Sequence, residues 1–564
     1  MGSRASSAER IDVTSASLHA LLTRVQPKLA TDEYRELQAI IDTLLHLADL
    51  LAKKRTSIAR LRALLFGACT ETTRKVLAKV GLRCVTEHTS PAYEGTRSEA
   101  RGDKRCTGHG RNGAAAYAGG QQIHVPHPHL KPGDHCPLCA KGKVYDQRDP
   151  HVLVRFVAQA PIGAKVTVLE TLRCNLCGEL FTAPVPDDVG DEKCDASTGA
   201  MIALLKYGCG VPFNRLARLQ ASVEIPLPVS TQWEIVAAVA TRLHPMLDEL
   251  TRQAADGELL HNDDTPMRVL SLLRKETAGT PDLPASPPPA LPADSTADDV
   301  APERTGVFTS GIVATCGDHR VALFLTGRHH AGENLATVLA ARSPGLPPPI
   351  QMCDALPHNV PKDFAGIVAN CLAHARRGIV DVTTDFPDEC RYVLERLREV
   401  YAYDAQTRQQ KMSPEDRLVF HQVHSGPVMA ALHAWFTTQL EARRVEPNSG
   451  LGDAITYFLK HWTKLTRFLT VPGAPLDNTI VERALKRAIL HRKSALFFKT
   501  LNGAKVGDLF MSAIHTCELN AVNPFAYLVA LQQHAGALAA TPSAWMPWNY
   551  RVTLQQLKEG ADTG

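Results

Sequence analysis

Three short segments of the chain carry acidic side chains that could share metal ions. Asp263 and Asp264 lie in "HNDDTP", Asp354 in "MCDAL" and Glu482 in "VERALKR". Enzymes that transfer phosphoryl groups use shared carboxylates to hold two Mg²⁺ ions about 3.5–4 Å apart, which stabilise the attacking and leaving oxygens. Together the three segments predict a metal-dependent nuclease-type site.

Each acidic residue also has an ordinary explanation. An Asp at the end of a strand commonly forms a turn or a cap. Glu482 precedes Lys486 by four residues, a spacing at which a helical ion pair contributes about 0.3–0.5 kcal/mol. On pattern alone the choice between Asp263 and Asp264 stays open, and the prediction depends on the joint placement of the three segments.

Glu482 lies in a basic stretch of the chain. Between residues 459 and 505 there are ten Lys and Arg residues and two acidic ones. Local positive charge of this kind is typical of a surface that contacts a polyanion. The side chains expected to neutralise phosphates are Arg483, Lys486, Arg487, Arg492 and Lys493.

The elements around the carboxylates follow a recognisable order. From residue 257 onward the pattern predicts strand, strand, strand, helix, strand, helix and strand, with a final helix over 478–491. This order predicts a ribonuclease H-like α/β core, in which acidic residues on the first and fourth strands lie side by side and a later helix supplies the third. Helical patterns fill most of the interval before Glu482, so a helical insertion would deliver it.

The fold class expected for the whole chain is multidomain α+β, because a single core rarely exceeds about 300 residues. The predicted regions are an N-terminal helical region (1–87), a flexible connector (88–125), a zinc ribbon (126–190), a helix-turn-helix region (191–250), the catalytic domain (251–510, with a disordered proline-rich loop at 274–305 and the helical insertion at 380–470) and a C-terminal helical tail (511–564).

Four of the 14 cysteines form two CxxC pairs, Cys136 with Cys139 and Cys174 with Cys177. Two such pairs flanking a hairpin can present four thiolates tetrahedrally to a structural Zn²⁺ ion, which would have no open position for chemistry. Redox-active or merely buried thiols are the alternative. The other ten cysteines are expected to be reduced and packed.

Two N-terminal features leave alternatives open. Residues 34–65 keep a heptad-like apolar step, which fits either a helix packed on its own domain or a dimerising coiled coil. Three helical segments over 191–250 fit a helix-turn-helix, although three helices are also a common way to close a small core.

The composition and the N-terminal segment argue against a membrane protein and a secreted protein. Hydrophobic residues make up 44% and charged residues 21%, and no run of about 18 apolar residues suggests a membrane span. The N-terminal "MGSRASSAERIDV" lacks the apolar stretch of a signal peptide. The expected location is therefore the cytoplasm.

Several motifs resemble those of one family. They are "LRALLFG", the paired CxxC knuckles, "VSTQWEIV", "NDDTPMRVL", "MCDAL", "CLAHARR", "LDNTIVERALKRAILHRKSALFF" and "WMPWNYR". Nearly end to end, the chain resembles the transposases of the insertion sequence 66 family, which are bacterial DDE transposases. It departs from the family pattern at Ala355, at Ser494 and in the proline-rich loop.

The resemblance implies a reaction and its participants. It assigns Asp263, Asp354 and Glu482 as ligands of catalytic Mg²⁺ or Mn²⁺, with Asp264 at an adjacent Glu position. Water and then a freed 3′ hydroxyl would attack phosphodiester bonds. The implied partners are double-stranded DNA (element inverted repeats and target), further copies of the chain on that DNA and accessory proteins, all at the bacterial nucleoid.

Other readings remain beside this one. Cys371 and His374 in "CLAHARR" are interpreted as packing or phosphate-contacting residues, with metal binding as the minor alternative. The whole chain could also be a decayed or domesticated transposase that binds DNA without catalysis, or a structure-specific nuclease on the same fold.

Overall fold

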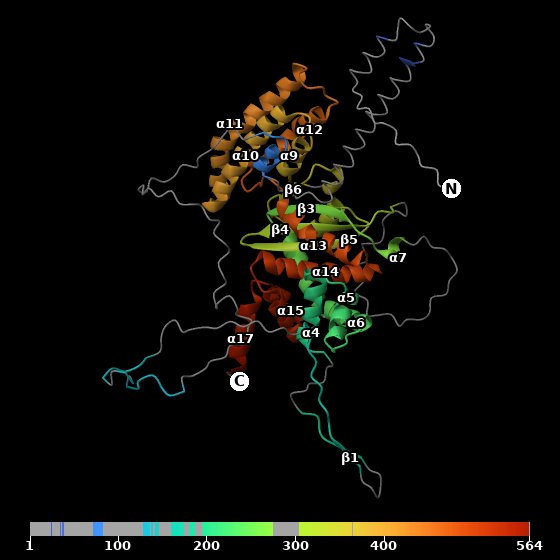
Figure 1. The fold of residues 1–564 in the computed structure, drawn as a ribbon, viewed down its shortest axis with the longest axis vertical. Coiled ribbons are helices and arrows are strands. Elements are labelled where there is room, and N and C mark those ends of the chain that lie inside the picture. The colour runs from blue at the N-terminus through green and yellow to red at the C-terminus, as the bar shows by residue number, and fades with distance from the viewer. Residues whose placement is uncertain are drawn as a thin grey trace, which may run out of the picture.

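The computed structural model describes residues 24, 34, 37–38, 72–82, 128–135, 137–138, 141–145, 160–173, 180–186, 194–273, 304–363 and 365–562. This part of the chain is a mixed α+β structure built around one five-stranded sheet (Figure 1). Within the described ranges, no helix combines the length and the apolar character that crossing a bilayer requires.

The five-stranded sheet has the order β5-β4-β3-β6-β7. β3 pairs antiparallel with β4, which pairs antiparallel with β5, while β3, β6 and β7 run parallel. This order is consistent with a ribonuclease H-like core. The strands are β3 (Leu259–Pro266), β4 (Phe308–Cys316), β5 (His319–Gly327), β6 (Ile350–Cys353) and β7 (Ile367–Asn370).

Helices cover the sheet because its strands are apolar on both faces. β4 buries its residues almost without interruption, as expected for a strand covered on both sides. One hydrophobic core joins β3, β4 and β5 to helices that precede and follow these strands in the sequence. The helices in this core include α4 (Ala196–Ala203), α6 (Val229–Ala255), α8 (Ala331–Leu339), α13 (Thr479–Ala495), α14 (Leu501–Leu519) and α15 (Pro524–Gln533).

Helix α14 also closes the free edge of the sheet. Ala322, Phe324 and Thr326 of β5 donate their backbone N–H groups to Thr516, Ser512 and Asp508, which follow one face of α14. An uncovered strand edge would invite pairing with another chain. The polar side chains of α14 therefore complete the hydrogen bonding that no sixth strand supplies.

A second core forms the helical layer on the other side of the sheet (Figure 1). It joins β6 and β7 to the helices between β7 and α13 and to the short α3 (Thr73–Lys79). The helices predicted before Glu482 are thus present. They are α9 (Leu372–Asp381), α10 (Pro387–Gln409), α11 (Pro414–Glu441), α12 (Gly450–Leu465) and the 3₁₀ turn η5 (Arg467–Leu469).

The remaining elements are short or peripheral. They are β1 (Thr171–Arg173), β2 (Leu180–Thr182), the π-helical turn η3 (Leu204–Gly208), α5 (Phe213–Ser222), α7 (Leu270–Leu273), the 3₁₀ turn η4 (Pro357–Asn359), α16 (Ala535–Ala540), η6 (Pro542–Trp545) and α17 (Tyr550–Asp562).

Several predictions fall outside the described residues. These are the cysteines Cys136, Cys139, Cys174 and Cys177, nearly all of the 34–65 helix, and the proline-rich loop up to residue 303. β1 and β2 pair antiparallel and bracket the second CxxC pair. The zinc ribbon itself stays a prediction.

The three helices predicted over 191–250 are present as α4, α5 and α6. α6 is longer than predicted, runs to Ala255 and packs against β4 and β5. It therefore belongs to the core that supports the sheet, and the helix-turn-helix stays a prediction.

Candidate active site

Asp263 and Asp354 come from neighbouring parallel strands. β3 and β6 pair with His261 opposite Met352, and continuing this register by two residues sets Asp263 opposite Asp354. The Asn359 side-chain amide donates to Asp354 Oδ1 and lies 3.5 Å from Asp263 Oδ1. One amide nitrogen therefore contacts both carboxylates.

A buried amide network holds Asn359 in this place. Asn262 Nδ2 and Gln351 Nε2 each donate to the Asn359 backbone carbonyl at 2.7 Å, and Gln351 also donates to Asn262 Oδ1. Asn370 Nδ2 donates to the backbone carbonyl of Asp354 at 3.2 Å. The side-chain nitrogens of these buried amides all donate, although the side-chain oxygens of Gln351, Asn359 and Asn370 accept no bond within the described residues. Their donated bonds fix the backbone that carries both aspartates.

Neither of the two aspartates has a neutralising cation among the described residues. Asp354 is buried, with 8% of its surface exposed, Asp263 is half-buried, and neither side chain forms an ion pair within the described chain. Burial, and after it the Asp354 carboxylate, raise the pKa of Asp263 to about 7, although the Asp264 N–H donates to its Oδ1. Asp264 and Glu482 add to this repulsion. Such an arrangement favours either a proton or a metal ion between the carboxylates.

Glu482 reaches the same region from the first turn of α13. Asn478, which precedes the helix, donates through Nδ2 to the Asn262 carbonyl at 3.0 Å and accepts from His261 Nδ1 at 2.9 Å. These bonds fix the start of α13 to β3. The Glu482 carboxylate then lies 3.5 Å from His374 Nδ1, whereas Lys486 is exposed and forms no ion pair within the described chain. The helical ion pair considered from the spacing is therefore absent here.

Cys371 and His374 have the partner that their spacing alone did not show. Together with Glu482 they offer ligand atoms within 4.8 Å of one another. Cys371 Sγ accepts from the Asn478 backbone N–H, and burial raises the pKa of this thiol to about 12, which keeps it protonated. Its complete burial and this hydrogen bond fit the packing role predicted for Cys371. Burial also lowers the pKa of His374, so a neutral imidazole faces Glu482.

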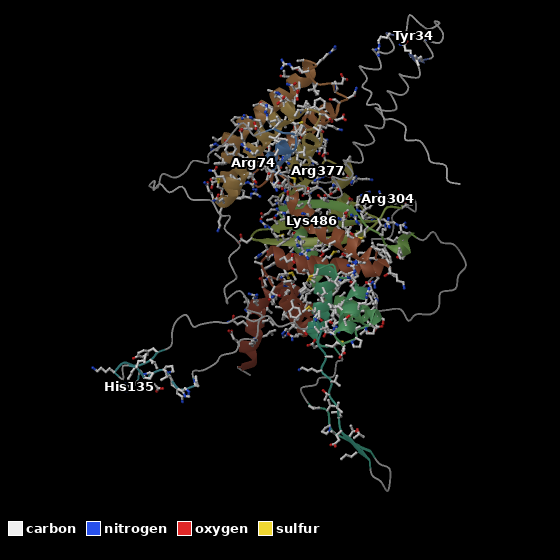
Figure 2. The ribbon with its side chains drawn as sticks, viewed as in Figure 1. Tyr34, Arg74, His135, Arg304, Arg377 and Lys486 are labelled. Atoms are coloured by element: carbon white, nitrogen blue, oxygen red, sulfur yellow. The ribbon has the colours of Figure 1, made fainter. Side chains whose placement is uncertain are left out.

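The predicted phosphate-binding residues divide into two groups. Arg483, Lys486 and Lys493 are exposed along one face of α13, and Lys486 is labelled beside the sheet in Figure 2. Arg487 instead bonds to Glu518 and to the Gly208 carbonyl, and Arg492 bonds to Thr265 and the Pro266 carbonyl. In this structure the second group joins elements of the core.

Comparison with known proteins agrees with this geometry. A model of the family described as "Transposase IS66 family" matches residues 193–280 and 318–506, which include all three predicted carboxylates. The chain belongs to this family of transposases. The uncharacterized protein y4jD of Sinorhizobium fredii (strain NBRC 101917 / NGR234) is 26% identical over 78% of this chain and 84% of its own length. The uncharacterized protein y4hP of the same organism is 24% identical over 75% of this chain and 74% of its own length.

The donor set of this IS66 family transposase fits a hard divalent cation. Asp263, Asp354 and Glu482 supply oxygen ligands only, as Mg²⁺ and Mn²⁺ prefer. Burial, and after it repulsion from the neighbouring carboxylates, raises the pKa of Asp263, and a cation among them would relieve that repulsion. The residues present therefore fit the metal that the family implies.

Sequence reasoning missed the amides of this transposase. Asn359 lies in "LPHNV", which matches no metal or catalytic motif, so no signal in the sequence could have found it. Asn478 lies four residues before Glu482 within the "LDNTIVER" segment, and its position in that motif could have suggested a part in placing α13.

Proposed function

We propose that this IS66 family transposase cuts and joins DNA strands at the ends of a mobile element, with Asp263, Asp354 and Glu482 as ligands of catalytic Mg²⁺ or Mn²⁺. The observation that carries the proposal is the pair of buried Asp354 and half-buried Asp263, which no cation of the described residues neutralises, beside a glutamate delivered from a distant helix. A carboxylate cluster of this kind costs stability, and holding a metal ion is a sufficient reason to keep it.

In this proposal the protein positions groups and supplies no nucleophile. The metal ions, when bound, would activate water or a 3′ hydroxyl and stabilise the leaving oxygen. Asn359 and its amide network keep the two aspartates at a fixed separation, and Asn478 keeps Glu482 beside them. Arg483, Lys486 and Lys493 are exposed on the helix that carries Glu482, so they are available to neutralise DNA phosphates there.

The proposal extends to the regions before the sheet, of which the zinc-ribbon cysteines lie outside the described residues. A Cys₄ zinc ribbon at Cys136, Cys139, Cys174 and Cys177, together with the predicted helix-turn-helix, would bind the inverted repeats. Several copies of the chain would act together on DNA in the bacterial cytoplasm, with an accessory protein as a further partner.

Cleavage of end-sequence DNA tests the catalytic proposal. The full chain is incubated with Mg²⁺ and a duplex carrying the inverted repeat of the flanking element, and strand breaks are mapped. Wild type should cut at the repeat end, and Asp354→Asn should bind the duplex without cutting it.

Asp318→Asn is the matched control, because it makes the same chemical change at an exposed turn between β4 and β5. It should cut like wild type. If wild type binds the repeat and never cuts, the alternative of a DNA-binding protein without catalysis replaces the proposal. Preferential cutting of branched DNA would favour the nuclease alternative.

A further inference from the structure

We propose a second metal site, formed by Asp264, His330 and His358 on the opposite side of β3 from the catalytic aspartates. Successive side chains of a strand point to opposite faces, so Asp264 points away from the side to which Asp263 points. His330 lies directly before α8 and His358 lies in η4. Three separate elements therefore bring one carboxylate and two imidazoles together.

The distances suit a shared ion. His330 Nδ1 lies 2.8 Å from Asp264 Oδ2, and the His330 and His358 rings lie 4.5 Å apart between centroids. Ligand atoms of all three residues lie within 4.8 Å of one another. In a tetrahedral site two ligands at about 2.0–2.2 Å from one ion are themselves about 3.3–3.6 Å apart. The Asp264 and His330 atoms, which now lie at hydrogen-bond distance, would separate slightly, and a small rotation of the exposed His358 side chain would complete the set.

The ligand types select the ion. Two imidazoles and one carboxylate are the donors that Zn²⁺ and neighbouring first-row dications prefer, whereas Mg²⁺ prefers oxygen ligands alone. A cavity of about 750 Å³ opens beside the cluster between α8 and the segments on either side of η4, and both histidines line it. This cavity gives an ion and its water ligands a route to the site.

Neighbouring residues give the site a consequence. Asp264 follows Asp263, and His358 precedes Asn359, whose amide contacts both catalytic aspartates. An ion bound to Asp264 and His358 would hold η4 against β3 and so restrict Asn359. This consequence rests on the proposed function, whereas metal binding itself does not.

Metal analysis of the full chain tests the site. Protein purified with added Zn²⁺ and freed of loose metal is compared with His330→Ala and His358→Ala by elemental analysis. Each variant should hold about one zinc ion fewer per chain than wild type. His329→Ala, at the neighbouring histidine outside the cluster, should hold as much zinc as wild type.

Cobalt substitution separates this site from any cysteine site. Only thiolate ligands give intense sulfur-to-cobalt charge transfer, so His358→Ala should lose weak visible absorption from the Asp and His ligands and keep the charge-transfer band. Because His358 is exposed, its variant should fold, and circular dichroism checks this.

The possible outcomes separate the two proposals. Equal zinc content and equal cobalt spectra in wild type, His330→Ala and His358→Ala would overturn the second site, whatever the DNA cleavage assay shows. Zinc loss in both variants of a chain that does not cut DNA would support the second site and contradict the proposed function alone.

Discussion

Two aspartates, the buried Asp404 in the helical layer and the half-buried Asp263 in the sheet, have opposite surroundings. Asp404 forms an ion pair with Arg408 at 2.9 Å and another with Arg417, and His421 Nε2 lies 3.5 Å from Asp404 Oδ1. Burial would raise the pKa of Asp404, but His421 and the two arginines hold it below its ordinary value. Asp263 has further carboxylates as its charged neighbours, and its pKa is raised.

This difference separates a carboxylate that serves the fold from one that, in the proposed function, holds a metal ion. A buried charge is costly unless the protein pairs it, and pairing is the usual solution where the charge only links helices. Around Asp404 the chain supplies that pairing from α10 and α11. Around Asp263 and Asp354 the described residues supply amides that fix position and no cation that pairs with the carboxylates.

The largest expected effects follow from Asp263→Asn. DNA cleavage should fall below detection, because the variant loses a proposed metal ligand. In buffer with a chelator, the free energy of unfolding should rise by about 1–3 kcal/mol, since the change removes repulsion among buried carboxylates. Adding Mg²⁺ should raise the melting temperature of wild type and leave that of the variant almost unchanged.

A chelated wild type that is as stable as Asp263→Asn, or more stable, would contradict the comparison. It would mean that the fold already compensates for the charge of Asp263. Asp318→Asn supplies the control for a general effect of removing one negative charge.

The next largest effect is expected at Asp404, where a substitution should lower the free energy of unfolding rather than raise it. Asp404→Asn should lower the free energy of unfolding by about 3 kcal/mol, because it removes the acceptor that pairs two arginines in a largely buried setting. Asp388→Asn is the matched control on α10, where an exposed carboxylate pairs with Arg391 at 2.9 Å. Its effect should stay below about 0.5 kcal/mol. Chemical denaturation of the two variants measures both values. Similar losses of unfolding free energy would show that burial does not make the ion pairs of Asp404 more stabilising than an exposed pair.

The sequence predicted the strand order and the helical insertion because their signals are local. Apolar strands of four to nine residues and long amphipathic helices are readable from periodicity. The approach of an aspartate in "NDDTP" to Asp354 was predictable for the same reason, whereas the choice of Asp263 over Asp264 came from the resemblance to the transposase family.

The contacts that fix the site could not be predicted in this way. Asn359 acts through one amide that reaches two carboxylates, and this depends on the path of the chain after β6 rather than on any motif. Arg487 and Arg492 look like phosphate ligands by composition, yet their hydrogen bonds to Glu518, Thr265 and two carbonyls arise only from tertiary packing. Residue type determines which chemistry a side chain can perform, and the fold determines which charged side chains are already bonded to other groups of the protein.

Another aspartate, the buried Asp508, lies between these two extremes. Within the described residues it forms no ion pair and no carboxylate shifts its pKa, and it accepts hydrogen bonds from the N–H and hydroxyl groups of Thr326 at the covered edge of the sheet. Burial raises its pKa to about 7, although the hydrogen bonds from Thr326 oppose this. Asp508 therefore tests burial without strong charge pairing of either sign.

The pH dependence of the free energy of unfolding should show the contribution of the Asp508 carboxyl. A carboxyl whose pKa is higher in the folded than in the unfolded chain favours folding while it is protonated. That contribution is complete below the ordinary value of 3.8 and is lost as the pH rises toward about 7. Between about pH 5 and pH 8, wild type should therefore lose about 2 kcal/mol relative to Asp508→Asn, which cannot ionise. Denaturation of both proteins at the two pH values measures this difference, and a constant gap between them would mean that the edge of the sheet solvates the Asp508 carboxylate as well as water does.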